Sequence, residues 1–269
     1  ANALREPFNR YVINIRASYY QETAAAVRHM VKDLKLSRIA VFYQYDAYGF
    51  DGLTGTELAL KEFGLEPVAR GSYVRGTMDV EEGLARIERS GAEAVVMIGT
   101  YDPCSKFIQL AGEHGYTPMF YPVVVMSQVV PPSEAAPRDG LIGSDPPPVQ
   151  GIAAEYVRLL AQYYPDDKPN SVGLEGFINA RILVEGLKLA GRDLTREGFI
   201  SALESIRDFT LGPGTVVSFG PENHQGMERV YFTRFMDGRF RVLSDWSEVM
   251  QAMRHTPSAE AEKAKGGQP

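Results

Sequence analysis

The sequence lacks the features of several common classes of protein. Cys104 is the single cysteine among 269 residues, so no disulfide can form within the chain. One cysteine is compatible with the cytoplasm and with the periplasm, and does not decide between them. No apolar run reaches the roughly 18 residues that a membrane-spanning helix needs. The formal net charge of −6 argues against a nucleic-acid-binding surface.

Signatures of catalysis and of metal binding are also scarce. The four histidines are scattered without metal-ligand spacing. There is no phosphate-binding loop and no Gly-x-Ser-x-Gly turn, and the glycines from Gly49 to Gly55 do not form a dinucleotide fingerprint. Cys104 follows Pro103 at the start of an expected helix, where a thiol pKa can be lowered, but it has no evident catalytic partner. The sequence therefore predicts neither an enzyme nor a metal or cofactor site.

The most informative stretch is 38–55, RIAVFYQYDAYGFDGLTG. Ile39 to Phe42 is a short apolar run typical of a strand buried on both faces. Hydrogen-bonding side chains follow it directly, namely Tyr43, Gln44, Tyr45, Asp46 and Tyr48. In parallel α/β sheets, ligands bind just beyond the carboxyl ends of the strands. The cluster predicts a site for a small polar molecule; the alternative is an ordinary turn with a polar rim.

Strands and helices alternate along the first half of the chain. The pattern predicts strands at 10–16, 39–42, 67–73 and 94–98, and helices at 20–36, 53–63, 79–90 and 103–113. Such alternation predicts an α/β fold with a parallel sheet between helices. The turns 43–48 and 99–102 then lie at the same sheet edge, because right-handed crossovers bring all carboxyl ends together.

The second half of the chain is rich in helices. Helices are predicted at 151–164, 174–190 and 195–206, and strands at 215–219, 229–235 and 239–243, with a hairpin turn at Asp237-Gly238. Residues 121–130 are an apolar segment, 131–150 are expected to be irregular, and 257–269 to be a disordered tail. Few strands are available to cover the apolar faces of the three helices. Either another chain covers these faces, or the sequence lacks part of the same protein.

Several motifs together resemble one family. They are RASY at 16–19, IAVFYQYDAYG at 39–49, TMDV at 77–80, AVVMIGTYDP at 94–103, QVVPP at 128–132, LEGFINA at 174–180 and LTREGFISALE at 194–204. Their order and spacing resemble the branched-chain amino-acid binding family, the type I periplasmic solute-binding proteins of ABC transporters. The resemblance spans Phe8 to Trp246.

The resemblance implies two α/β lobes with a hinged cleft that closes over a ligand. It assigns residues 1–16 and 131–211 to an incomplete N-terminal lobe, and 17–130 and 212–247 to a C-terminal lobe, followed by a flexible tail at 248–269. The first part of the family's N-terminal lobe has no counterpart in this sequence, and a loop that the family usually carries after Phe120 is also missing.

The resemblance also suggests ligand-binding residues. Tyr48 and Tyr101 match the family's cleft aromatics, in a Tyr-Gly turn and in the Gly-x-Tyr-x-Pro turn that contains Thr100. Ser18 and Tyr19 lie at a helix start, where backbone N–H groups can meet an anion. Gln44 and Asp46 are candidates either to bind an ammonium group or to fix their loop. Glu175 lies near the start of a helix that the resemblance directs toward the cleft.

The predicted function is that of a periplasmic receptor. It would bind an amino acid or a related carboxylate and deliver it to the membrane permease of an ABC transporter. The residues ANALREPFNR at the start contain no signal-peptide core, so an export signal is expected to have been removed or never to have been there. One alternative is a sensory domain of the same fold that feeds a signalling protein. Another is an α/β enzyme using residues 43–48, which would need a base and a nucleophile that the sequence does not offer.

Overall fold

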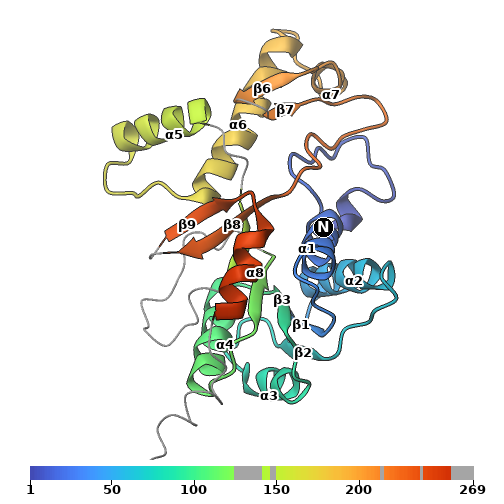
Figure 1. Ribbon diagram of the computed structural model, residues 1–269. Coiled ribbons are helices and arrows are strands. Elements are labelled where there is room, and N and C mark those ends of the chain that lie inside the picture. Colours follow the sequence, from blue (N-terminus) through green and yellow to red (C-terminus); the bar gives the residue numbers. More distant parts are fainter. Residues whose placement is uncertain (124–140, 146–149, 213–214, 237–238, 256–269) are drawn as a thin grey trace, which may run out of the picture. The chain divides into compact units, whose positions relative to one another are not determined.

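The computed structural model describes residues 1–123, 141–145, 150–212, 215–236 and 239–255. The chain divides into two compact α/β units (Figure 1). The first unit contains residues 1–22 and 145–231, and the second contains 23–144 and the chain from 232 onward. Within the described residues, every helix is too short or too polar to span a membrane.

A parallel sheet forms the centre of the second unit. Its strands are β1 (Ile39–Gln44), β2 (Arg70–Tyr73), β3 (Ala94–Ile98) and β4 (Met119–Pro122), in the spatial order β2-β1-β3-β4. Every neighbouring pair is parallel. All five residues of β3 are fully buried, as expected for a strand covered on both faces. The predicted parallel sheet is therefore confirmed.

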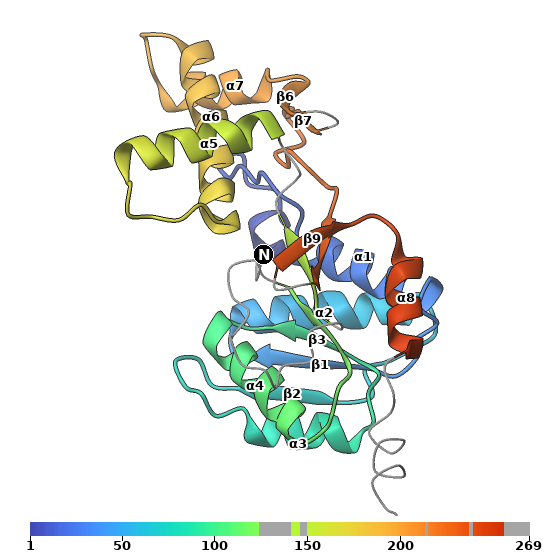
Figure 2. The same cartoon turned by 60° about the vertical axis from the view of Figure 1, so that its left-hand side comes forward.

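Helices cover both faces of this sheet (Figure 2). The helices α1 (Tyr19–Lys32) and α2 (Ala47–Lys61) lie on one face, and α3 (Glu81–Arg89) and α4 (Tyr101–Glu113) lie on the other. The core between the sheet and α3 and α4 contains large apolar side chains, including Phe42, Leu84, Phe107 and Phe120. This layer order follows from the alternation of strand and helix in the sequence.

Helix α2 begins six residues earlier than the sequence predicted. Asp46 caps it, because its carboxylate accepts hydrogen bonds from the backbone N–H groups of Tyr48 and Gly49. The glycines suggested a loop, but they serve close packing instead. A Cβ on Gly49 would lie 1.8 Å from the carbonyl oxygen of Gln44, and one on Gly52 would lie 2.4 Å from Ile98 Cγ1. The helix approaches the sheet more closely than a side chain would permit.

The second unit also contains a three-stranded sheet. Strands β5 (Ile142–Asp145), β8 (Tyr231–Met236) and β9 (Arg239–Leu243) lie in the order β5-β8-β9, and β8 and β9 are antiparallel. Helix α8 (Trp246–His255) follows. The expectation of a flexible tail from residue 248 is wrong up to His255, because Trp246 and Val249 are buried and anchor this helix. The remainder of the tail, from 256 to 269, lies outside the described residues.

Three helices dominate the first unit. They are α5 (Gln150–Tyr163), α6 (Ser171–Ala190) and α7 (Arg196–Glu204), preceded in the chain by a short 3₁₀ helix, η1 (Asn2–Leu4). Asn170 and Thr195 cap α6 and α7 by accepting hydrogen bonds from the N–H groups of Gly173 and Gly198. Strands β6 (Phe209–Gly212) and β7 (Thr215–Val217) form an antiparallel pair. A core that includes Ile178, Ile182, Leu203, Val217 and Phe219 joins these elements.

The strand predicted at 10–16 is not formed. Only Asn14 makes a bridge, with Gln225. The segment lacks a longer backbone partner among the described residues, although Ile13 and Ile15 still point into the core of the first unit, as an alternating pattern requires. Arg10 binds both Glu197 and Glu204 and so holds the segment against α7.

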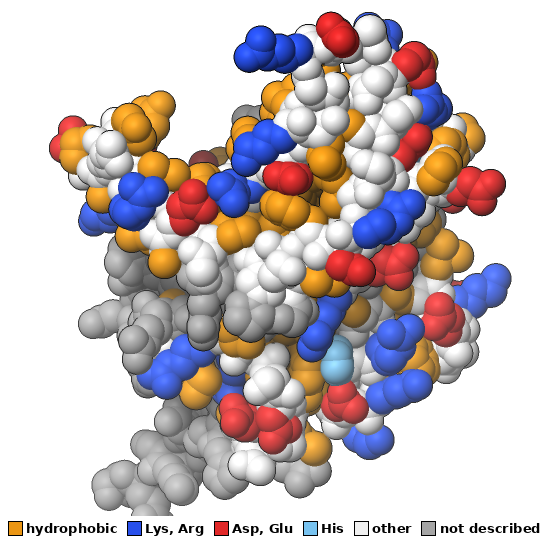
Figure 3. All heavy atoms as spheres, turned by 90° about the horizontal axis from the view of Figure 1, so that it is seen from above, with side chains coloured by type: hydrophobic (Ala, Val, Ile, Leu, Met, Phe, Trp, Pro, Cys, Tyr) orange, Lys and Arg blue, Asp and Glu red, His pale blue; other side chains and the backbone are white. Residues whose placement is uncertain are grey.

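Helix α6 exposes a stripe of apolar side chains. Val172 is 56% exposed, Leu183 49% and Leu187 39%. At helical spacing, these three side chains lie along one face. Figure 3 views the side of the molecule on which α6 and α7 lie, and hydrophobic side chains reach the surface there among charged ones. The imbalance between apolar helices and available strands is thus present in the folded chain.

Some boundaries differ from the expected ones. The resemblance assigned 212–231 to the C-terminal lobe. In the structure these residues belong with the first unit, because β7 pairs with β6 and Phe219 packs in that unit's core. Residues 17–22 also fall in the first unit. The expectations for most of 121–150, including QVVPP, and the hairpin at 237–238 lie outside the described residues.

Candidate functional site

The carboxyl edge of the parallel sheet carries the polar cluster that the sequence singled out. Gln44 ends β1 and is 4% exposed. Its Nε2 donates to Asp46 Oδ2 at 2.5 Å, and its Oε1 accepts a hydrogen bond at 2.9 Å from the hydroxyl of Tyr73, which ends β2. Both ends of the Gln44 amide are therefore engaged within the protein.

Asp46 is also engaged. Its Oδ1 accepts hydrogen bonds from the N–H groups of Tyr48 at 3.0 Å and Gly49 at 3.1 Å, and Arg75 lies 3.9 Å from Oδ2. Burial opposes ionisation of this carboxyl, but the hydrogen bonds from Gly49, Gln44 and Tyr48 outweigh it and hold its pKa below the ordinary value. Of the two roles considered for Gln44 and Asp46, these contacts favour fixing the loop.

The two candidate aromatic residues lie at helix starts of the same unit. Tyr48 is the second residue of α2 and is half-buried. Tyr101 is the first residue of α4, half-buried, and its hydroxyl has no hydrogen-bond partner among the described residues. Thr100 precedes it as the N-cap residue and is exposed. Strands β1 and β3 are neighbours, so the sheet brings both turns to one edge, as predicted.

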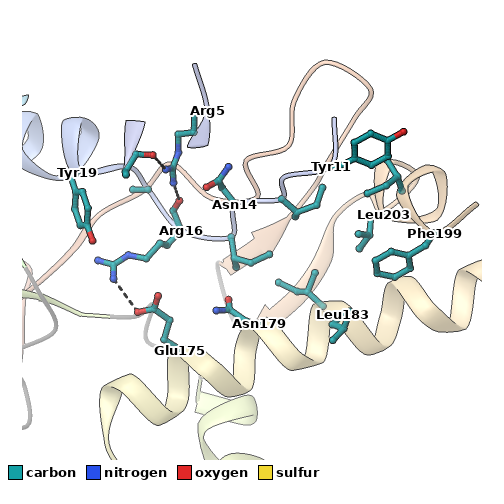
Figure 4. Close-up of a pocket in the computed structure, with 16 residues that line it drawn as sticks. Arg5, Tyr11, Asn14, Arg16, Tyr19, Glu175, Asn179, Leu183, Phe199 and Leu203 are labelled. Atoms are coloured by element: carbon teal, nitrogen blue, oxygen red, sulfur yellow. Dashed lines mark hydrogen bonds and ion pairs between the residues drawn. The ribbon is translucent and has the colours of Figure 1, made fainter. Parts of the chain in front are cut away.

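Two of the three remaining candidates line a cavity of about 490 Å³ within the first unit (Figure 4). Tyr19 and Glu175 line it, together with Arg16 and Asn179. Its other wall is apolar and includes Ile13, Ile15, Ile182, Leu183, Phe199 and Leu203. Ser18 does not line the cavity; it is buried, and its Oγ accepts a hydrogen bond from Gln21 N at 3.1 Å and caps α1. The cavity has one polar end and one apolar end.

Arg16 organises the polar end of this cavity. Its guanidinium lies 3.0 Å from Glu22 Oε2 and 3.0 Å from Glu175 Oε2. The Glu22 side chain is 1% exposed, and Arg16 supplies a positive charge beside this buried carboxylate. Glu175 thus faces a cation of the protein itself. No sequence pattern marked Arg16 as a functional residue, although Arg16 is the first residue of the RASY motif.

Tyr73 is the second residue that sequence reasoning missed. Its hydroxyl joins the turns after β1 and β3, because it bonds Gln44 Oε1 and also accepts from Thr100 N at 2.8 Å. No sequence signal marks it, since a tyrosine at the end of a strand is common and its partners come from β1 and from the turn after β3.

Cys104 and three of the four histidines are either buried in the core or paired with a carboxylate. Cys104 is fully buried, and burial raises its pKa to about 12 rather than lowering it, so the expectation based on its helix position is wrong. His29, His114 and His224 each have a carboxylate partner: Asp33, Glu88 and Glu204. No group of three or more metal-binding side chains occurs in the described part of the chain. The sheet edge offers hydroxyls, aromatic rings and helix starts, which suit recognition.

A model of the family described as periplasmic binding protein matches residues 2–239. The chain belongs to the periplasmic binding protein family. This establishes the resemblance predicted from the sequence. It also agrees with the expectation of a binding protein rather than an enzyme, because the family is one of binding proteins. Solved structures of similar proteins have the same fold, which confirms the predicted α/β fold class.

Individual members of the periplasmic binding protein family show how much of the fold is present. A "Leu/Ile/Val-binding protein homolog 8" from Brucella abortus (strain 2308) is 22% identical over 239 residues, which cover 83% of this chain and 58% of the relative. The crystal structure of a possible leucine/isoleucine/valine-binding protein from Rhodopirellula baltica SH 1 matches with a TM-score of 0.81 and 31% identity, over 93% of this chain and 70% of that one.

A branched-chain amino acid ABC transporter structure from Thermus thermophilus, with bound valine, shares the fold of this periplasmic binding protein. The two match with a TM-score of 0.77 and 19% identity, over 94% of this chain and 72% of the Thermus chain. The chain therefore spans a little over half of the curated relative and about seven-tenths of the two solved structures.

Proposed function

We propose that the chain is part of an extracytoplasmic receptor of the periplasm, which binds an amino acid or a related carboxylate and delivers it to the permease of an ABC transporter. Membership of the periplasmic binding protein family carries the proposal. The names of the Brucella and Rhodopirellula relatives, both of which refer to leucine, isoleucine and valine, support the ligand class. The first unit would belong to the N-terminal lobe and the second to the C-terminal lobe.

The proposed ligand contacts of the second unit are Tyr48, Thr100 and Tyr101. These three residues follow β1 and β3 at the carboxyl edge of a parallel sheet, the edge where α/β proteins bind ligands. Tyrosine suits this role because it offers an apolar face and a hydroxyl on one rigid side chain. Gln44 and Asp46 would act behind these residues by holding the turn.

The cavity of the first unit would contribute Tyr19 and Glu175, with Ser18 behind them. Glu175 has the charge to pair with an ammonium group, but it would share its carboxylate with Arg16, 3.0 Å away. A zwitterionic ligand presents an ammonium and a carboxylate close together, which matches a wall that offers both an acidic and a basic side chain.

A thermal-shift screen of the complete gene product tests the proposal. The panel contains leucine, isoleucine, valine, the other common amino acids, and small aliphatic and aromatic carboxylates. A ligand at a hundred times its dissociation constant stabilises the fold by about 2.7 kcal/mol. For a chain of 150–250 residues, that raises Tm by roughly 5–10 °C, and by less for a longer chain. Stabilisation by carboxylates alone would revise the ligand class, and no shift with any compound would contradict the proposal.

A further inference from the structure

One buried hydroxyl connects the two turns at the sheet edge. Tyr73 ends β2 and is 2% exposed. Its hydroxyl donates to Gln44 Oε1 at 2.9 Å, accepts from Thr100 N at 2.8 Å, and lies 3.2 Å from Thr100 Oγ1. One donor and two acceptor positions are all that a phenol offers, so the Tyr73 hydroxyl is fully used.

The connection continues from Gln44 to the start of α2. Gln44 Nε2 donates to Asp46 Oδ2 at 2.5 Å, and Asp46 Oδ1 accepts from Tyr48 N at 3.0 Å and Gly49 N at 3.1 Å. An unbroken series of hydrogen bonds thus runs from the backbone before Tyr101 to the backbone of Tyr48. We call this series the Tyr73 relay; its members are Thr100, Tyr73, Gln44, Asp46 and the N–H groups of Tyr48 and Gly49.

We propose that Tyr73 is a positioning residue for ligand recognition, which holds the turn carrying Tyr101 and the helix start carrying Tyr48 in one fixed arrangement. This inference rests on the proposed function, because it assumes that these two side chains contact the ligand. Tyr73 itself need not touch the ligand. Pre-organised contact residues bind more tightly because less conformational freedom is lost on binding.

The surroundings of Tyr73 are shaped to admit its ring. Gly99 directly follows β3. A Cβ at this position would lie 3.0 Å from the Tyr73 hydroxyl and 2.7 Å from Cys104 Sγ. Phe42 stacks on the ring, with 5.4 Å between centroids. Burial raises the pKa of Tyr73, so the hydroxyl remains protonated and continues to donate to Gln44. Removing this hydroxyl would leave the buried Gln44 Oε1 and the N–H of Thr100 without this partner.

Hydrogen exchange tests the Tyr73 relay without any ligand. Tyr73→Phe keeps the ring and removes the hydroxyl. We expect faster amide exchange at Thr100, and also at Tyr48 and Gly49, by about tenfold, while β3 amides remain protected. The matched control is Tyr116→Phe in the same unit, which removes a single hydroxyl hydrogen bond of 2.9 Å to Ala92 O before the start of β3. In the control, these three amides should exchange as in the wild type.

Calorimetric titration of the complete gene product with leucine, isoleucine and valine tests the consequence. We expect Tyr73→Phe to weaken the affinity for whichever of the three binds by about tenfold, within the usual range for coupling between sites. Tyr116→Phe should change it less than twofold. If Tyr73→Phe does not fold, Gln44→Met interrupts the relay at its next link and should give the same two results.

The outcomes separate the relay from the proposed function. If the wild type binds none of the three amino acids, the ligand is not a branched-chain amino acid, and hydrogen exchange still decides whether the relay couples the two turns. Unchanged exchange at Tyr48 and Gly49 in Tyr73→Phe would overturn the inference. So would an equal loss of affinity in Tyr116→Phe, because the effect would then be general destabilisation.

Discussion

Single residues at the sheet edge divide into those that we propose to contact a ligand and those that hold the turns. In the sequence, Gln44 and Asp46 lie next to the tyrosines and are polar like them, so all were candidates for the same ligand site. The structure gives them different tasks: the amide and the carboxylate are satisfied within the protein, whereas the Tyr101 hydroxyl has no partner among the described residues. A polar side chain already satisfied internally gains little by contacting a ligand.

Replacing the two aromatic residues that we propose as ligand contacts should therefore weaken binding. Tyr48→Ala and Tyr101→Ala are each expected to cost about 2 kcal/mol of binding free energy, the size typical of a buried aromatic contact. Tyr101→Phe should cost less, about 0.5–1.5 kcal/mol, because it removes only the hydroxyl. Calorimetry with the ligand found by the screen measures both. Tyr163→Ala, at an exposed position on α5, is the control, and full affinity in both alanine variants would remove these residues from the site.

Cys104 predicts a dependence of stability on pH. Burial raises its pKa from the ordinary 9.0 to about 12. Above pH 9 the unfolded chain loses the thiol proton while the folded chain keeps it, so the stabilisation is complete below pH 9 and is lost as the pH rises toward 12. In urea unfolding, the wild type should therefore lose stability relative to Cys104→Ala as the pH rises from 9 toward 12. The native thiol should also resist a thiol reagent at pH 8, and rapid modification would show that it is accessible.

At the scale of elements, contact distance decides where a helix can begin and how it packs. Helix α2 contains three buried glycines at its sheet side, Gly49, Gly52 and Gly55. Glycine is unfavourable in an isolated helix, and the helix was therefore predicted from the sequence to begin only at residue 53. Tertiary packing reverses the preference, because only residues without a Cβ permit this distance between α2 and the sheet.

The same substitution should have opposite effects in two helices. Gly52→Ala places a Cβ 2.4 Å from Ile98 Cγ1 and should destabilise the second unit by about 1–3 kcal/mol. Gly176→Ala in α6 meets nothing within 4 Å and should stabilise the first unit by about 0.5–1 kcal/mol. Urea unfolding followed by circular dichroism compares the two variants with wild type. A neutral Gly52→Ala would show that α2 is free to move away from the sheet.

At the scale of the whole molecule, the chain exposes apolar surface in its first unit. The stripe on α6 lies in a chain that spans 58% of its curated relative, so the two expectations from the sequence, a covering partner or further chain of the same protein, both remain open. In either case the uncovered stripe should bind hydrophobic probes when the 269 residues are studied alone.

Dye binding measures this exposure. The 269-residue chain should enhance the fluorescence of 1-anilinonaphthalene-8-sulfonate, and the double substitution Leu183→Gln and Leu187→Gln should lower the signal substantially. Leu58→Gln, at an isolated 51% exposed position in the second unit, serves as the control and should leave the signal unchanged. Equal signals from all three proteins would mean that the stripe is not available to the dye.

The local sequence was sufficient to predict the features of the fold that depend on interactions between neighbouring residues. Strand β3 was predicted at its observed bounds, because a short β-branched run between turn signals admits few other conformations. The Thr195 cap, the alternation of strand and helix, and the common edge of the two tyrosine turns follow for similar reasons. These features depend on neighbours in sequence or on the handedness of connections, and both can be read from one chain.

Only the tertiary structure decided which polar groups are free and which are engaged. Segment 10–16 has the alternation of a strand, but among the described residues its one β-bridge is at Asn14, because strand pairing requires a second segment at the right distance. Cys104 has a raised pKa because the core surrounds it, whatever its position on the helix. Tyr73 acquires its role from Gln44 and Thr100, 29 and 27 residues away. Burial and hydrogen bonding at long range are properties of the packed chain, so local sequence does not contain them.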